Sequence, residues 1–194
     1  MVGVRRVHGA ATGNIFTALK RHAKDTPCQV FSESLKLKVS ENIFYPDVFV
    51  TCNKANLQAD MIFITPTVVV EVLSPSPQAF DWKWKFAAYR QITALKEYLL
   101  VDPDSRVVEL YRRGTDGLFT LHDYTEQFAC ELAAIGYVMA NTDIFEGLTP
   151  TRYLNMAMPL RGGYKKSLRA ARESSGFTRG HLHARYNVTH NYFQ

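Results

Sequence analysis

The stretch Thr67-Val-Val-Val-Glu71-Val-Leu-Ser74 decides the fold of this 194-residue chain, because it places one acid inside an otherwise apolar strand. Apolar residues on both faces are expected of a central strand that is covered on both sides of a sheet. Glu71 shares its face with Val69 and Leu73, and a glutamate among such neighbours is rarely buried without a partner. The stretch therefore predicts that Glu71 either pairs with a basic side chain or binds a metal ion.

A second acid, Asp47, opens the preceding predicted strand directly after Pro46. A proline lacks a backbone donor, which suits the first residue of a strand at a sheet edge. Adjacent strands lie about 5 Å apart, so two carboxylates at their ends can share one cation. The alternative is an ordinary turn aspartate.

Asp81, Lys85 and Tyr89 are spaced four residues apart and share one face of a helix predicted to follow Pro77 and to run to about Ile92. They form either an exposed ion pair or a set that places the Lys85 ammonium beside the carboxylates. In the second case the ammonium polarises the attacking water and stabilises charge on a phosphate. Together with Asp47 and Glu71, this pattern predicts a metal-dependent nuclease.

Four more residues are interpreted from their positions. Lys36 lies on the polar side of a strand and either faces solvent or reaches the same cleft. His8 precedes the first helix and is interpreted as structural, with a contact to the site as the alternative. Trp82 and Trp84 are interpreted as packing residues rather than as platforms for base stacking.

The composition is that of a globular protein, with 46% hydrophobic and 21% charged residues. Neither a signal peptide nor an apolar run of about 20 residues is present, which predicts a cytoplasmic protein without a membrane segment. The three cysteines, Cys28, Cys52 and Cys130, form no zinc-type pair and are interpreted as buried thiols in a reducing cytosol.

The net charge of +5 is a property of the C-terminal tail. Residues 151–194 carry eight Lys or Arg and one acid, Glu173, a net charge of +7, so the rest of the chain carries −2. We therefore predict a nuclease domain over residues 1–150 and a basic, poorly ordered tail over 151–194, which is either a solvated arm or a nucleic-acid contact.

Periodicity and turn residues predict the order of elements. The order is a helix over 12–24, one long or bent strand over 28–39, a strand over 47–51, a polar loop over 52–66, a strand over 67–73, the helix to 92, a strand over 97–102, a hairpin of 106–111 with 118–124, short strands over 128–132 and 136–138, and a short helix near 142.

Six stretches between residues 8 and 148 form a joint pattern: His8-Gly-Ala-Ala-Thr-Gly-Asn-Ile-Phe16, Tyr45-Pro-Asp-Val-Phe-Val-Thr51, Val69-Val-Glu-Val-Leu-Ser-Pro-Ser76, Asp81-x-x-x-Lys85-x-x-x-Tyr89-Arg90, Glu97-Tyr-Leu-Leu-Val-Asp102 and Val108-Glu-Leu-Tyr-Arg112. On this pattern the chain resembles the Uma family of restriction endonucleases, an offshoot of the PD-(D/E)xK nuclease superfamily.

The resemblance implies an α/β fold, a restriction-endonuclease-like core in which helices flank a central mixed β-sheet in the order helix, three strands, helix, strand (αβββαβ), with an added β-hairpin. It implies that Asp47 and Glu71 are ligands of Mg²⁺, with Mn²⁺ as a substitute, and that DNA is the substrate. The superfamily lysine position, two residues after Glu71, holds Leu73, and Lys85 looks like the migrated replacement.

Three hypotheses follow. The first is a Mg²⁺-dependent endonuclease that uses Asp47, Glu71 and Lys85 as catalytic residues, supported by Asp81, Lys36 and Tyr89. The second is a catalytically inactive nuclease fold that binds DNA or a protein, favoured by the lack of the family's acidic N-terminal segment. The third is a structural protein in which Glu71 forms an internal ion pair. A homodimer is compatible with the first, because two sites cut both strands most easily.

Overall fold

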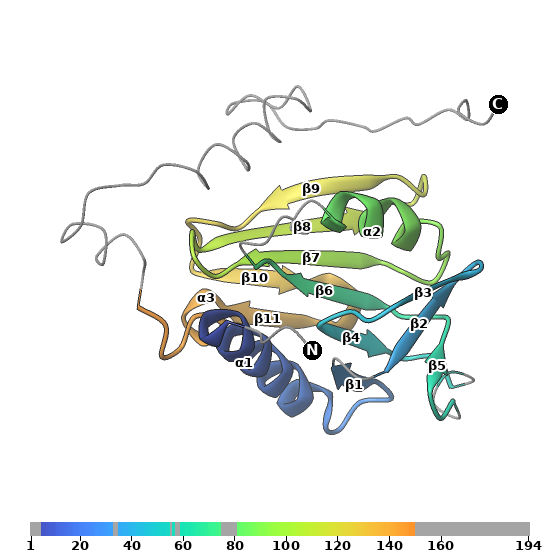
Figure 1. The fold of residues 1–194 in the computed structure, drawn as a ribbon, viewed down its shortest axis with the longest axis horizontal. Helices are drawn as coiled ribbons and strands as arrows, with labels where there is room; N and C mark the ends of the chain where they lie inside the picture. The colour runs from blue at the N-terminus through green and yellow to red at the C-terminus, as the bar shows by residue number, and fades with distance from the viewer. Residues whose placement is uncertain (1–4, 33–34, 55, 57–58, 75–80, 150–194) are drawn as a thin grey trace.

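The computed structural model describes residues 5–32, 35–54, 56, 59–74 and 81–149, which form a mixed sheet covered on both faces (Figure 1). β6 (Val68–Val72) lies inside a six-stranded sheet of order β1-β4-β6-β7-β8-β9, and all its residues are buried, as the apolar stretch predicts. The other strands are β1 (Gln29–Ser32), β4 (Val48–Thr51), β7 (Glu97–Asp102), β8 (Val107–Arg113) and β9 (Phe119–Asp123).

β6 and β7 are parallel, whereas the other neighbouring pairs of this sheet are antiparallel. Along the chain the main elements follow the order α1, β1, β4, β6, α2, β7, which is the predicted helix, three strands, helix, strand order. β8 and β9 form the predicted hairpin, and its pairing extends the sheet beyond β7.

The helix α1 (Arg6–Ala23) covers one face of the sheet. Its Ile15 and Leu19 pack in one apolar cluster with Val68 and Val70 of β6. The same cluster contains side chains of a second layer made of β10 (Ala129–Leu132), a 3-10 turn (Ala133–Ile135), β11 (Tyr137–Ala140) and α3 (Asn141–Ile144).

The other face is covered by α2 (Asp81–Tyr89) and by a small three-stranded sheet of order β3-β2-β5. Leu37, Phe44 and Tyr89 pack there with Val69 and Leu73. The strands of the small sheet are β2 (Lys36–Val39), β3 (Asn42–Phe44) and β5 (Ile62–Phe63). Because alternate β6 side chains point to opposite faces, Glu71 faces α2 together with Val69.

Several boundaries differ from the sequence prediction. α1 begins at Arg6 rather than at residue 12, because Gly9 and Gly13 are poor helix formers and conceal the apolar period of the first turns. The predicted continuous strand over 28–39 is β1 and β2, which belong to different sheets. β3 and β5 were missed, since strands of two or three residues carry no period. The predicted tail, 151–194, lies outside the described residues.

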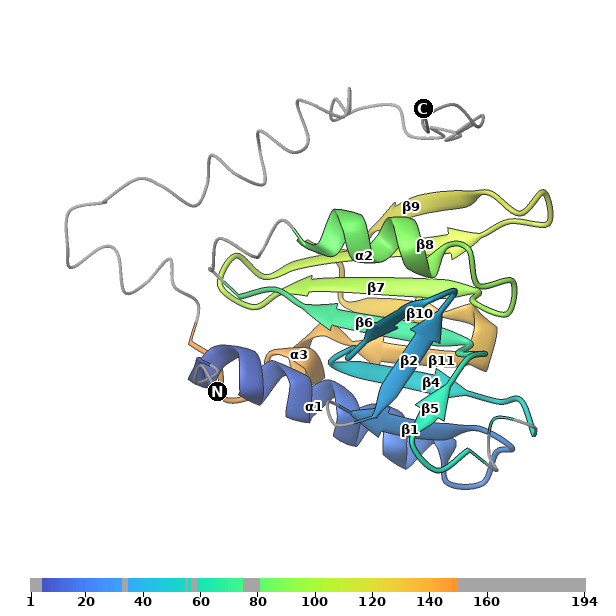
Figure 2. The same ribbon diagram turned by 45° about the vertical axis from the view of Figure 1, so that its right-hand side comes forward.

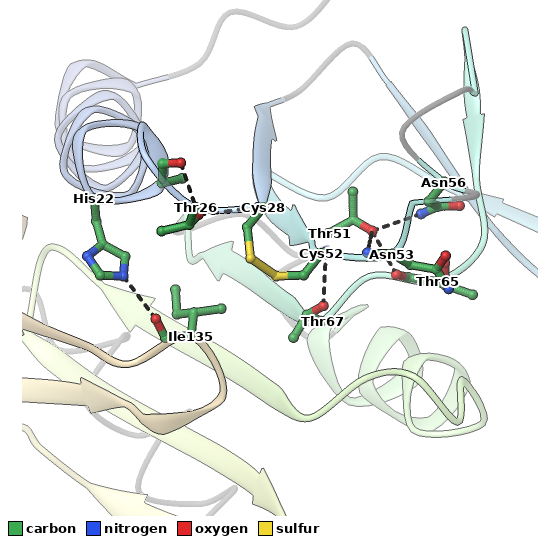
Figure 3. Close-up of a disulfide and its surroundings, with 11 residues drawn as sticks. His22, Thr26, Cys28, Thr51, Cys52, Asn53, Asn56, Thr65, Thr67 and Ile135 are labelled. Carbon is green, nitrogen blue, oxygen red and sulfur yellow. Dashed lines mark hydrogen bonds between the residues drawn. A yellow bond between two sulfur atoms is a disulfide. The ribbon is translucent and has the colours of Figure 1, made fainter.

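The prediction that Cys28 and Cys52 are thiols is wrong in this structure, where they form a disulfide (Figure 3). Gln29 pairs with Thr51 across β1 and β4, so the cysteines just beyond them face each other, with Cα atoms 4.0 Å apart. Sequence spacing could not show this strand register. Cys130 is a buried free thiol, as predicted.

Of the helices formed by the described residues, none combines the length and the apolar character needed to cross a bilayer.

Candidate active site

Glu71 is the centre of a polar cluster on the α2 side of the sheet. It is 5% exposed, and both of its carboxylate oxygens have partners on α2. The Lys85 ammonium donates to Oε2 at 2.7 Å, and the Tyr89 hydroxyl donates to Oε1 at 3.0 Å. The spacing of four residues in α2 therefore places both donors over one strand residue, as the predicted helix face requires.

Burial raises the pKa of the Glu71 carboxyl from 4.5 to about 7. The Lys85 ammonium opposes this shift, and the nearby Asp47 carboxylate adds to it. Burial and Asp47 thus raise the pKa of Glu71 by more than the Lys85 ammonium and the Tyr89 hydroxyl lower it. The same surroundings raise the pKa of the Tyr89 hydroxyl, so that it stays a donor to Glu71. The cluster therefore favours an additional positive charge close to its carboxylates.

Asp47 lies next to Glu71 because the antiparallel pair β4–β6 aligns Val48 with Val70. The next aligned residues in this register are Asp47 and Glu71, so the two acids lie side by side. The backbone N–H of Val72 donates to Asp47 Oδ2 at 2.7 Å, so the carboxylate is fixed by the strand that carries Glu71. β4 begins immediately after Asp47, and the Asp47 side chain, rather than a carbonyl of the strand ladder, accepts the Val72 N–H.

His8 also joins the cluster, although sequence reasoning gave preference to a structural role. Its Nε2 lies 3.3 Å from Asp47 Oδ1, so the two Asp47 oxygens have different partners. The available signal was its position shortly before the predicted first helix, which was too weak without knowledge of where that helix packs on the sheet. Figure 2 places the start of α1 at the same side of the molecule as the ends of β6 and β7.

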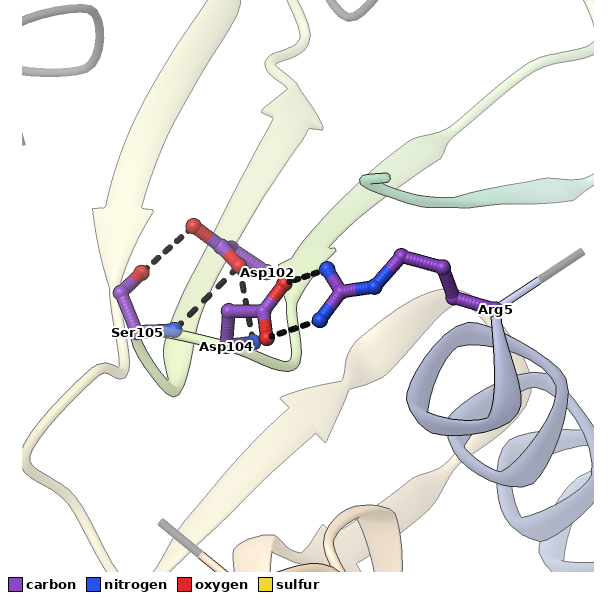
Figure 4. A network of polar contacts seen from close by, with 4 residues as sticks. All are labelled: Arg5, Asp102, Asp104 and Ser105. Carbon is purple, nitrogen blue, oxygen red and sulfur yellow. Dashed lines mark hydrogen bonds and ion pairs between the residues drawn. The ribbon is translucent and has the colours of Figure 1, made fainter. Parts of the chain in front are cut away.

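A polar network fixes the start of α1 (Figure 4). The guanidinium of Arg5, which precedes the helix, donates to both oxygens of Asp104, at 2.6 and 3.2 Å. Asp104 lies in the turn after β7, and its backbone N–H donates to the buried Asp102 carboxylate. Since His8 lies within the first turn that Arg5 anchors, this network holds the imidazole in reach of Asp47.

The structure brings Asp47, Glu71, Lys85 and Tyr89 together. It does not bring Lys36 to them: Lys36 pairs with the exposed Ile62 on the outer face of the small sheet, whereas its neighbour Leu37 faces the core. Asp81 begins α2, and its side chain is outside the description.

The donor set suits one hard divalent cation. Each carboxylate oxygen has one contact in the cluster, and an ionised carboxylate offers about four lone-pair sites in total, so one acceptor site per oxygen is left over. Within the described ranges no group of three or more His, Cys, Asp or Glu residues could hold a metal. Two acids alone fit Mg²⁺, which keeps several waters and takes one or two carboxylates together with a substrate phosphate.

The element order and the mixed sheet define the restriction-endonuclease-like fold of nucleases. A solved structure from Anabaena variabilis, titled as "a putative nuclease belonging to DUF820", shares the fold with a TM-score of 0.62. It is 16% identical in sequence, and the match covers 73% of this chain and 82% of that one.

The family follows from the sequence. Residues 1–137 match the family Uma2, described as "Putative restriction endonuclease", and the chain belongs to this family. Two similar proteins of Synechocystis sp. are "Uncharacterized protein slr1290" and "Uncharacterized protein sll1609". The first is 32% identical over 76% of this chain and 79% of its own length, and the second is 33% identical over 60% and 68%.

Proposed function

We propose that this protein is a Mg²⁺-dependent endonuclease that hydrolyses DNA phosphodiester bonds, with Mn²⁺ as a substitute ion. The observation that carries the proposal is the pair of neighbouring carboxylates, Asp47 and Glu71, with the Lys85 ammonium 2.7 Å from Glu71. Family membership and the fold support the nuclease class. The proposed substrate is DNA, and a homodimer and a cytoplasmic location remain predictions from the sequence.

Asp47 and Glu71 would hold the ion, which when bound supplies an acidified water and neutralises charge on the phosphate. The Val72 N–H and His8 orient Asp47 so that its carboxylate stays beside Glu71. Tyr89 orients Glu71 in the same way. Lys85 has three ammonium hydrogens, of which one is directed to Glu71, so it can also donate to a phosphate oxygen as charge develops there.

A specific observation favours the second candidate function, a catalytically inactive nuclease fold that binds DNA or a protein. All four carboxylate oxygens of the acid pair already have a partner within the protein. A self-satisfied cluster is also what a structural ion pair between Glu71 and Lys85 would produce. The three hypotheses differ in metal affinity and in the effect of removing one acid.

The test is a supercoiled-plasmid cleavage assay with Mg²⁺, Mn²⁺ or EDTA, run beside calorimetric titration of each ion into protein without DNA. The variants are Asp47→Asn and Glu71→Gln, with Glu131→Gln as the matched control, because that exposed acid lies on β10 and contacts Arg112. We expect nicking by wild type and Glu131→Gln only with metal. Either site variant should lose roughly 100-fold or more, since even residues that only support a ligand contribute about 10- to 100-fold.

Ion binding without any cleavage would support the inactive binding module, provided that the far-ultraviolet circular dichroism spectrum shows the protein to be folded. The absence of both binding and cleavage, together with a large loss of stability in Glu71→Gln, would support the structural ion pair.

A further inference from the structure

We propose that Trp84 and Tyr45 form a base-binding site beside the acid pair, and that the substrate is therefore single-stranded or locally unpaired DNA. The inference rests on the proposed nuclease function and names its substrate class. Trp84 is 59% exposed and Tyr45 is 51% exposed. The sequence interpretation of both tryptophans as packing residues covers only part of this arrangement: Trp82 is half-buried against the apolar cluster, whereas Trp84 contacts Phe44 but is mostly exposed.

Both aromatic residues adjoin the proposed catalytic residues in sequence. Tyr45 precedes Pro46-Asp47, and Trp84 directly precedes Lys85. A ring contact links the two segments, because the Phe44 ring lies 5.1 Å from the Trp84 ring, centroid to centroid. Since Phe44 is the residue before Tyr45, the two exposed aromatic residues belong to segments that contact each other through Phe44.

Trp84 is held in place without being covered. Phe44 is buried and also contacts the ring of Tyr89, at 5.1 Å between centroids, and Tyr89 donates to Glu71. A chain of ring contacts thus fixes the indole relative to the carboxylates, while most of its surface remains in water. Fixed, exposed aromatic rings suit a ligand with a flat apolar face, because little side-chain freedom is lost on binding.

The neighbouring chemistry selects a nucleic-acid strand as the ligand. Lys83 is exposed on α2, and its ammonium lies 5.8 Å from the centroid of the Trp82 ring, so the helix that carries Trp84 also carries a cation that can contact a phosphate. Aromatic rings together with basic side chains are the means by which proteins bind single strands without regard to sequence. In a duplex the faces of the bases are stacked on one another and are not available to an exposed protein ring. An unpaired strand can place a base on Trp84 while its phosphate lies at the acids.

The fluorescence of Trp84 provides a direct test, because the chain has only two tryptophans. In the variant Trp82→Phe, combined with Glu71→Gln and EDTA to prevent cleavage, all indole emission comes from Trp84. We expect a 20-nucleotide thymidine strand to quench this emission and a blunt duplex of equal length to leave it nearly unchanged. Trp84→Ala should weaken single-strand binding about tenfold, the usual order for one stacked base, and Tyr45→Ala should act in the same direction.

Phe128→Ala is the matched control, because Phe128 is 96% exposed but precedes β10, which packs on the α1 face. It should leave both binding and quenching unchanged. If Trp82→Phe lowers stability, wild type and Trp84→Phe are compared instead, and the quench must disappear in the latter.

Equal quenching by duplex and single strand would overturn the proposed base-binding site. Single-strand binding that Trp84→Ala leaves unchanged would overturn it as well. Protein that cleaves plasmid without any change in Trp84 emission would overturn it as well while keeping the nuclease. Quenching by the single strand from protein that never cleaves would keep the base site and remove the nuclease.

Discussion

The burial of Glu71 makes the stability of the metal-free protein depend on pH. In the unfolded chain this carboxyl ionises near its ordinary pKa of 4.5, whereas in the fold burial delays ionisation to about pH 7. Raising the pH through this window ionises the unfolded state first and lowers the free energy of unfolding. The contribution is fully present below pH 4.5 and lost above pH 7, and it amounts to about 3 kcal/mol.

Glu71→Gln should remove this pH dependence. Urea unfolding of the EDTA-treated protein at pH 5 and pH 8 measures it, and we expect wild type to lose more stability over that range than the variant does. Glu131→Gln, which removes an exposed acid, should follow wild type. Parallel curves for wild type and Glu71→Gln would contradict the buried, proton-binding Glu71.

The Glu71–Lys85 pair makes a second prediction at this scale. Lys85→Met leaves a buried carboxylate without its ammonium and should cost about 3 kcal/mol of unfolding free energy. Lys85→Met introduced into the Glu71→Gln variant should cost much less, because that variant has no carboxylate at position 71 to lose its ammonium partner. Lys83→Met, an exposed neighbour on α2, should change stability by less than about 0.5 kcal/mol. Equal effects of Lys85→Met in both backgrounds, measured by urea unfolding, would show that the two side chains are not coupled.

At the scale of elements, the Cys28–Cys52 bond fastens the edge strand β1 to β4. It closes a segment with a sequence separation of 24, which should contribute about 3 kcal/mol by restricting the unfolded chain. Cys52→Ser should lower the free energy of unfolding by that amount. A reductant should destabilise wild type but not the variant.

The thiol count in denaturant checks the bond itself. One reactive thiol is expected, from Cys130, if the bond is formed, and three if it is not. Cytosolic reductants oppose such bonds, so the count is made on protein purified without and with a reductant. Three thiols in protein that was never exposed to a reductant would contradict the disulfide.

The elements also show which features a sequence can reveal. β6 and β7 were predicted because every residue of both strands is buried, and a continuous apolar run predicts such strands. The contacts of Glu71 with Lys85 and Tyr89 could be anticipated because helix spacing is a local rule, and the neighbourhood of Asp47 and Glu71 because successive strands often pair. The His8–Asp47 contact and the disulfide depend on register and on where α1 crosses the sheet, which no local pattern contains.

At the scale of the whole molecule, the charge is divided between the two predicted parts of the chain. We predict that a chain of residues 1–149 folds by itself, because its apolar clusters draw on both ends of that range, from Val7 to Leu148. Its thermal midpoint should equal that of the full chain. The full chain should bind DNA more tightly at low salt and with a steeper salt dependence, since residues 151–194 add a net charge of +7. An identical salt slope for both chains would contradict a nucleic-acid role for the tail.

The separation along the chain of the residues that build the site has a consequence for folding. Glu71 meets Lys85 and Tyr89 across 14 and 18 residues, whereas Arg5 meets Asp104 across 99. Contacts that close short loops form early, and those that close long loops wait for the chain ends to meet. We therefore expect the ion pair of Glu71 to assemble first and the anchoring of His8 on Asp47 to come last. A chain still emerging from the ribosome would have the Glu71 ion pair but not the contact of His8 with Asp47. The complete site would therefore form only after α1 packs on the sheet.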